Sequence, residues 1–68
     1  MQPGDLRRFN PKAYAPAHPN IGGKIFMVLA VNLPLRRETA DLLLDGKVME
    51  QWNIPWIDAN SEVLSETR

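Results

Sequence analysis

Apolar and polar residues alternate over short stretches that are separated by turn-forming residues. Prolines, glycines and the dipeptide Asp45-Gly46 divide the 68-residue chain into pieces of about 5 to 9 residues, a spacing typical of β-strands. No window keeps an apolar period of 3.6 residues over the length that a stable helix needs. The pattern predicts five strands: Asp5–Phe9, Lys24–Leu33, Thr39–Leu44, Lys47–Trp52 and Ser61–Ser65.

The strand Lys24–Leu33 has the strongest signal, because every residue from Ile25 to Val31 is apolar. Side chains alternate between the two faces of a strand, and both faces here are apolar. Such a strand is buried on two sides for part of its length, or bends between two sheets. We place the odd-numbered face inward. The expected core is Leu6, Ile25, Met27, Leu29, Val31, Leu42, Val48, Trp52 and Val63.

Two segments between the strands predict turns or loops. Asn10–Gly23 holds three prolines and two glycines, and it is expected to form a long loop because proline cannot donate to a strand ladder. Asp45-Gly46 predicts a tight hairpin, since both residues tolerate positive φ. A two-residue loop would pair Leu43 with Val48, a three-residue loop would pair Leu42 with Val48, and the sequence leaves both registers open.

Asn53–Ala59 is too short and too interrupted by Pro55 for a strand, and it predicts a single 3₁₀ turn. The order is then strand, long loop, long strand, short loop, strand, tight hairpin, strand, 3₁₀ turn and strand. This order favours an all-β fold, a small five-stranded SH3-like barrel. The chain, residues 1–68, is expected to form one domain.

Charge is balanced overall but divided along the chain. Eight basic and eight acidic residues give a net charge of zero, which argues against a strongly basic nucleic-acid binder and against an acidic disordered tail. Residues 1–37 carry six basic residues against one acidic residue, and residues 38–68 carry two against seven. The folded domain therefore either has a positive and a negative side, or interleaves the two halves of the chain and mixes their charges.

Catalysis, metal binding and membrane insertion are not expected. The one histidine, His18, lies between Ala17 and Pro19, and the chain has no cysteine, so a nucleophile with an adjacent base is not indicated. Acidic and amide residues alternate over 58–62 without the glycine that a calcium loop needs. The longest mostly apolar run, Ile25–Leu35, is about half a membrane span. We expect no enzyme activity, cofactor, metal or small-molecule substrate.

Three stretches resemble one family in the order in which that family carries them. Pro3–Phe9 resembles the "PGDLVRF" opening of small SH3-like proteins of tailed bacteriophages, Leu43–Val48 resembles their "DGKV" turn, and Glu62–Glu66 resembles their "LEVISE" tail. The resemblance implies an SH3-like fold and a viral setting. It leads us to expect a non-catalytic structural or assembly component of the virion, made in the host cytoplasm, that contacts other virion proteins or copies of itself.

Aromatic and proline residues predict the contact surface. In signalling SH3 domains the groove between the first loop and the 3₁₀ turn binds polyproline ligands on aromatic side chains. Here Asn10–Gly23 and Ile54–Ala59 occupy those positions, although Lys12 and His18 replace the usual acidic residues of the first loop. Trp52 is expected in the core and Trp56 partly exposed. The predicted protein-binding residues are Tyr14, Pro16, Trp56 and Ile57.

Basic residues support a second hypothesis. SH3-like barrels of the KOW type bind RNA or ribosomal surfaces through loops, so the chain is alternatively a binder of nucleic acid or of a host ribonucleoprotein. A third class is a host-directed inhibitor that binds one bacterial protein. The candidate polyanion-binding residues are Arg7, Arg8, Lys12, Arg36 and Arg37.

Overall fold

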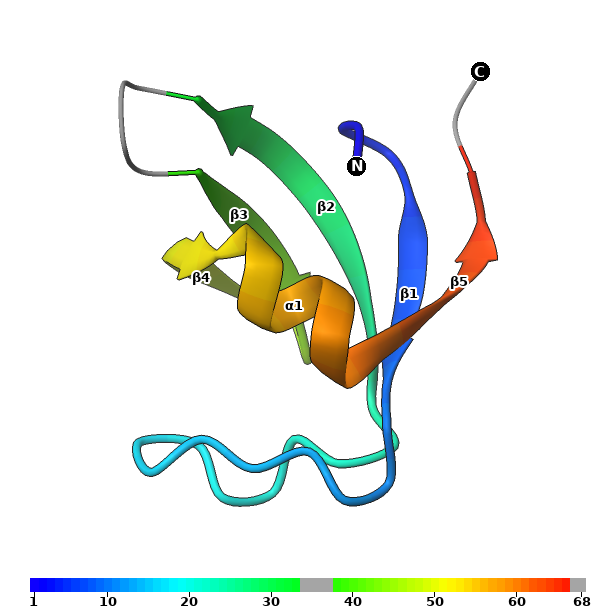
Figure 1. Cartoon of the computed structure of the whole chain (residues 1–68), viewed down its shortest axis with the longest axis vertical. Helices are drawn as coiled ribbons and strands as arrows, with labels where there is room; N and C mark the ends of the chain where they lie inside the picture. Colours follow the sequence, from blue (N-terminus) through cyan, green and yellow to red (C-terminus); the bar gives the residue numbers. More distant parts are fainter. Residues whose placement is uncertain (34–37, 67–68) are drawn as a thin grey trace.

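A computed structural model describes residues 1–33 and 38–66 as one antiparallel sheet and a short helix (Figure 1). The sheet has five strands in the order β4-β3-β2-β1-β5. The mostly-β prediction is confirmed, but within the described residues β4 and β5 do not pair, so the predicted closure into a barrel is wrong. The elements are β1 Leu6–Phe9, β2 Ile25–Asn32, β3 Thr39–Leu44, β4 Lys47–Asn53, α1 Ile54–Asn60 and β5 Ser61–Ser65.

The connection between the two edge strands is an α-helix, α1, and not the predicted 3₁₀ turn. Asn53 caps its first turn, because its Oδ1 accepts a hydrogen bond of 2.9 Å from the backbone N–H of Trp56. Pro55 lies in that same first turn, where its missing N–H would have no partner within the helix. Ile54 and Ile57 share one buried face. The proline that argued against a strand therefore fits the start of a helix.

The β3–β4 hairpin has the two-residue loop. Asp45 and Gly46 have φ of 53° and 74°, as a type I′ turn requires. Leu44 consequently pairs with Lys47, and Leu43 pairs with Val48. The structure thus selects one of the two registers that the sequence left open.

A bulge interrupts the same pair of strands further on. The register shifts between Ala40, which pairs with Trp52, and Leu42, which pairs with Met49. Gln51 lies within the bulge at a φ of 58°, and its backbone N–H donates to Asp41 Oδ1 at 2.9 Å. Because the bulge inserts one residue, side chains beyond it no longer follow the alternation read from the sequence.

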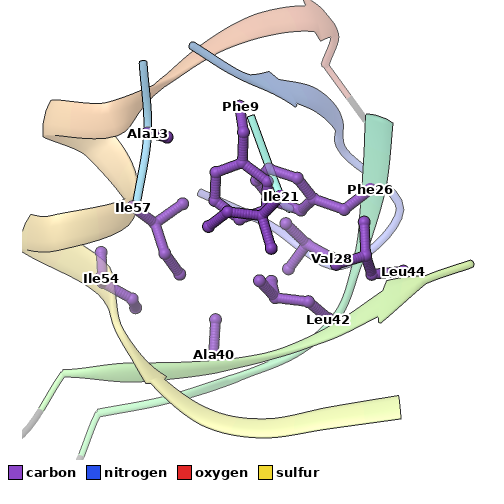
Figure 2. Close-up of a cluster of buried hydrophobic side chains, with 10 residues drawn as sticks. All are labelled: Phe9, Ala13, Ile21, Phe26, Val28, Ala40, Leu42, Leu44, Ile54 and Ile57. Atoms are coloured by element: carbon purple, nitrogen blue, oxygen red, sulfur yellow. The ribbon is translucent and has the colours of Figure 1, made fainter. Parts of the chain in front are cut away.

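The hydrophobic core lies on one face of the sheet, under α1 and the segment between β1 and β2 (Figure 2). Phe9 and Phe26 stack at its centre, with ring centroids 4.3 Å apart. Leu42, from the central part of the sheet, is fully buried as predicted. The buried apolar residues are Phe9, Ala13, Ile21, Phe26, Val28, Ala40, Leu42, Leu44, Ile54 and Ile57.

The predicted inward face of β2 is wrong. Phe26 and Val28 are 1% and 0% exposed, whereas Ile25 is 50% exposed. Because α1 and the long connection both lie over one face of the sheet, the other face is left to solvent within the described part of the chain. Four other residues of the expected core are also exposed, namely Met27, Leu29, Val48 and Val63.

Candidate protein-binding groove

The segment between β1 and β2, residues 10–24, is fixed to the sheet at its base. The backbone N–H of Phe9 donates to the Lys24 carbonyl at 2.9 Å, and that of Gly23 donates to the Phe9 carbonyl at 3.0 Å. Further along, the Ala13 and Ile21 side chains insert into the core. This loop is therefore held as a wall beside the sheet.

The tip of the loop is a turn over residues 15–18. The backbone N–H of His18 donates to the Ala15 carbonyl at 2.8 Å, and the two residues form an isolated bridge. Pro16 occupies the second position of this turn, where its fixed φ is suitable. The turn brings Pro16 and His18 to the side of the loop that lies against β4.

A pocket of about 360 Å³ separates this turn from the end of β4 and the start of α1. It is open to solvent and combines aromatic, proline and amide side chains. We call it the aromatic groove. Its lining residues are Ala15, Pro16, Ala17, His18, Gln51, Trp52, Asn53 and Trp56.

The two tryptophans of the aromatic groove are held by the core beneath them. Both lie 5.9 Å from the Phe9 ring, between centroids. Their own rings are 5.7 Å apart in an edge-to-face arrangement, and the His18 ring lies 5.5 Å from Trp52. Such contacts fix each ring in place, so the groove is formed before any ligand arrives.

The four predicted protein-binding residues do not all reach this groove. Pro16 and Trp56 line it together, although they are 40 positions apart in the chain. Tyr14 is 62% exposed but lies outside its lining. Ile57 is fully buried, because it belongs to the inner face of α1, and we withdraw it as a contact residue.

Sequence reasoning also missed residues that line the groove. The sequence predicts Trp52 in the core, yet Trp52 is only partly buried and contributes to the groove wall. His18, which the sequence places in the first loop without a binding role, lines the groove as well. The bulge at Gln51 changes which side chains of β4 face the core side of the sheet. No local sequence pattern predicts such a bulge. Two prolines near His18 were the available signal for an ordered turn there: Pro16 lies within the turn and Pro19 directly follows it.

A second pocket, of about 260 Å³, adjoins the aromatic groove. The two share Ala17 and His18. This second pocket lies toward the β3–β4 hairpin and carries two lysines, so we call it the basic pocket. Its lining residues are Ala17, His18, Pro19, Asn20, Ile21, Lys24, Leu44, Asp45, Lys47 and Met49.

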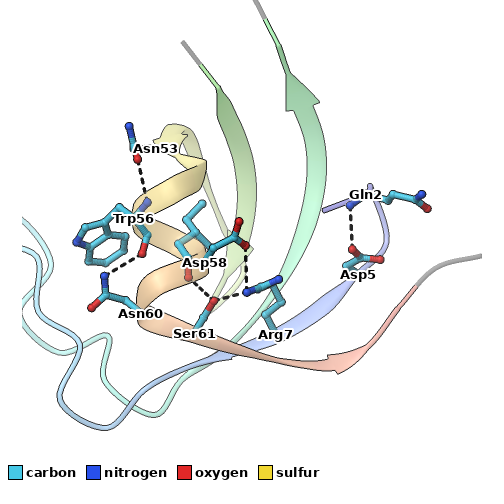
Figure 3. A network of polar contacts seen from close by, with 9 residues as sticks. Gln2, Asp5, Arg7, Asn53, Trp56, Asp58, Asn60 and Ser61 are labelled. Atoms are coloured by element: carbon cyan, nitrogen blue, oxygen red, sulfur yellow. Dashed lines mark hydrogen bonds and ion pairs between the residues drawn. The ribbon is translucent and has the colours of Figure 1, made fainter. Parts of the chain in front are cut away.

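Of the predicted polyanion-binding residues that the structure describes, Arg7 and Arg8 do not lie together. Arg7 faces the core side of β1 and is only 7% exposed; its Nε donates to Ser61 Oγ at 2.9 Å, and it lies 3.2 Å from Asp58 Oδ1 (Figure 3). Arg8 is on the opposite face and pairs with Glu62 at 3.5 Å. The two arginines lie on different faces of the sheet because neighbours on a strand point to opposite faces. Lys12 is exposed, and Arg36 and Arg37 lie outside the described residues.

Arg7 is therefore expected to stabilise the fold. Arg7→Ala should lower the free energy of unfolding by about 1–2 kcal/mol, because it removes packing and leaves the polar groups of the α1–β5 junction with fewer partners. Arg8→Ala is the matched control. It breaks only an exposed ion pair, and we expect a loss under about 0.5 kcal/mol. Urea denaturation followed by circular dichroism measures both, and equal losses would contradict this role of Arg7.

The described residues hold neither a metal-binding cluster nor a helix that could span a membrane. No group of three or more His, Asp or Glu side chains in this part of the chain is arranged to hold a metal ion. None of the helical structure in residues 1–33 and 38–66 is long and apolar enough to cross a membrane.

No protein-family model, no curated protein and no solved structure matches the chain. The function is consequently inferred from the groove itself and from the motifs of the sequence.

Proposed function

We propose that the protein is a non-catalytic interaction module that binds an extended, proline-containing segment of another protein in the aromatic groove. One observation carries this proposal. The two tryptophan side chains lie in an open pocket opposite the Pro16 turn, and the core already holds them in position.

Such a groove suits a polyproline II segment for two physical reasons. Proline rings pack on aromatic side chains, and the polyproline II conformation is largely formed before binding, so little conformational entropy is lost. A groove that is already rigid likewise loses little conformational entropy when the peptide binds. At the rim, the exposed Gln51 and Asn53 offer polar groups to the peptide backbone.

We also propose that this module belongs to the SH3-like class and acts in a tailed-phage particle. The strand order β4-β3-β2-β1-β5, with α1 between β4 and β5, supports the SH3-like interpretation, and the three family-like stretches of sequence support the viral one. Quantitative mass spectrometry of gradient-purified particles tests it. Presence at a fixed copy number would support a virion component, and absence from the particle would contradict it.

Trp56→Ala is expected to weaken binding of a proline-rich peptide at least about tenfold, since buried aromatic anchors dominate many interfaces. Fluorescence polarisation of a labelled Pro-x-x-Pro peptide gives the affinity. Val48→Ala serves as the control, because Val48 is 56% exposed and lies outside the groove. Unchanged affinity in a folded Trp56→Ala protein would contradict the assignment of this groove.

A further inference from the structure

We infer that the groove selects an acidic partner segment, with a carboxylate side chain in the basic pocket and a proline or apolar side chain in the aromatic groove. This inference rests on the proposed function, because it names the chemistry of the segment bound there. Two observations support it: the basic pocket adjoins the aromatic groove, and the basic pocket carries two lysines.

The two pockets form one channel along β4. Lys47, Met49 and Trp52 pair with Leu44, Leu42 and Ala40, and these three partners are all buried on the core side of β3. Lys47 and Met49 line the basic pocket, and Trp52 lines the aromatic groove. The loop residues Ala17 and His18 belong to both.

The length of this channel sets a spacing in the ligand. Because of the bulge, Lys47 and Trp52 pair with residues only four positions apart on β3, which corresponds to about 13 Å at a strand rise of about 3.3 Å per residue. A polyproline II segment rises about 3.1 Å per residue. An acidic residue about four positions from the anchoring proline therefore reaches the basic pocket while the proline remains at the tryptophans.

The charges of the basic pocket favour a carboxylate. Its two lysines face a single acidic residue, Asp45, whose carboxylate pairs with Lys24 Nζ. Lys47 forms no ion pair with any residue that the structure describes. The neighbouring pocket wall includes Ile21 and Leu44, which are 2% and 3% exposed. An incoming carboxylate would therefore meet an uncompensated ammonium beside apolar side chains, and a basic segment would be repelled.

Single-stranded nucleic acid fits this channel less well. Affinity for a nucleic-acid strand grows with the number of phosphates that Lys and Arg side chains neutralise, and the chain has a net charge of zero. The arginine of β1 on the core side is also engaged, by Asp58. The observations therefore favour a polypeptide.

Three labelled peptides test the charge preference with the full chain. They share one Pro-x-x-Pro core and carry two Glu, two Gln or two Lys residues about four positions from the core. At about 50 mM salt we expect the Glu peptide to bind at least about fivefold more tightly than the Gln peptide, and the Lys peptide to bind most weakly. At about 500 mM salt the differences should shrink, because the Debye length falls to a few ångströms.

The outcomes separate the two proposals. If no peptide binds, the proposed function fails. If all three bind equally, the proposed function stands and the acidic preference is overturned. A single-stranded oligothymidylate is the fourth probe, and tighter binding to it than to the Glu peptide, with a steep loss of affinity in salt, would overturn the choice of a polypeptide partner.

Two variants test the assignment to the basic pocket. Lys47→Gln should reduce the affinity for the Glu peptide to that for the Gln peptide. Asp45→Asn should raise the affinity for the Glu peptide two- to fivefold, because it removes the competing carboxylate, and Asn-Gly still forms a type I′ turn. Lys12→Gln is the control, since Lys12 lies outside both pockets. A decrease or no change in Asp45→Asn would contradict the assignment.

Discussion

Replacing Phe26 with alanine is expected to lower the free energy of unfolding by about 3–5 kcal/mol. Phe26 is 1% exposed and stacks on Phe9, and Phe9 in turn contacts both tryptophans of the groove. The substitution therefore removes a large buried side chain and also the support beneath the binding surface. A small domain has a total stability of the same order, so we expect much of the population to unfold.

Ile25→Ala is the matched control for this prediction. Ile25 precedes Phe26 in β2 and points to the opposite face, where it is 50% exposed. Its loss should cost under about 1 kcal/mol, because half of its side chain is already in water. Urea titration followed by tryptophan fluorescence and circular dichroism measures both variants. A larger loss from Ile25→Ala than from Phe26→Ala would mean that the other face of β2 is the buried one.

The contrast between these two residues explains how far the sequence alone could predict the fold. Strand positions follow from short apolar stretches between turn residues, and the Asp45-Gly46 hairpin follows from local backbone preferences, so both were predictable. The buried face of β2 was not. Its two faces are similarly apolar, and burial is decided by the loop and α1, which cover one of them and come from other parts of the chain.

The residues of the candidate site were likewise predictable only in part. Pro16 and Trp56 were predicted because proline and aromatic residues in loops often bind partners. The role of Trp52 depends on the bulge at Gln51, which shifts the side-chain alternation of β4. The burial of Arg7 depends on Asp58 and Ser61, more than 50 positions away. Contacts of this range leave no pattern in the sequence around Arg7, and the arginine was consequently assigned to a polyanion surface.

Gly22→Ala is expected to displace the loop that forms one wall of the groove. A Cβ atom at Gly22 would lie 2.4 Å from the backbone carbonyl oxygen of Pro11, a distance that real contacts do not allow. The clash involves backbone on both sides, so no side chain can rotate to relieve it. We expect a loss of about 2–3 kcal/mol in stability, as for overpacking of a closely packed site.

The same substitution should weaken peptide binding more than its effect on stability explains. Pro11 and Gly22 face each other across the base of the loop, and separating them changes the position of the Pro16–His18 turn relative to Trp52. We expect at least about a tenfold loss of affinity for the Glu peptide in the fraction that remains folded. Backbone amide chemical shifts of residues 11–22 and of the two indole N–H groups report the displacement directly.

Gly23→Ala provides the control, because the strain there has a different origin. Gly23 has a φ of +78°, and no atom lies within 4 Å of the Cβ position. Alanine at this site lowers the stability by about 1–2 kcal/mol through left-handed backbone strain, but its Cβ atom clashes with no other atom. Stability should fall while the peptide affinity of the folded protein stays near its original value. If Gly22→Ala instead retained full affinity, the loop would not act as a fixed wall, and the groove would not be formed before the ligand binds.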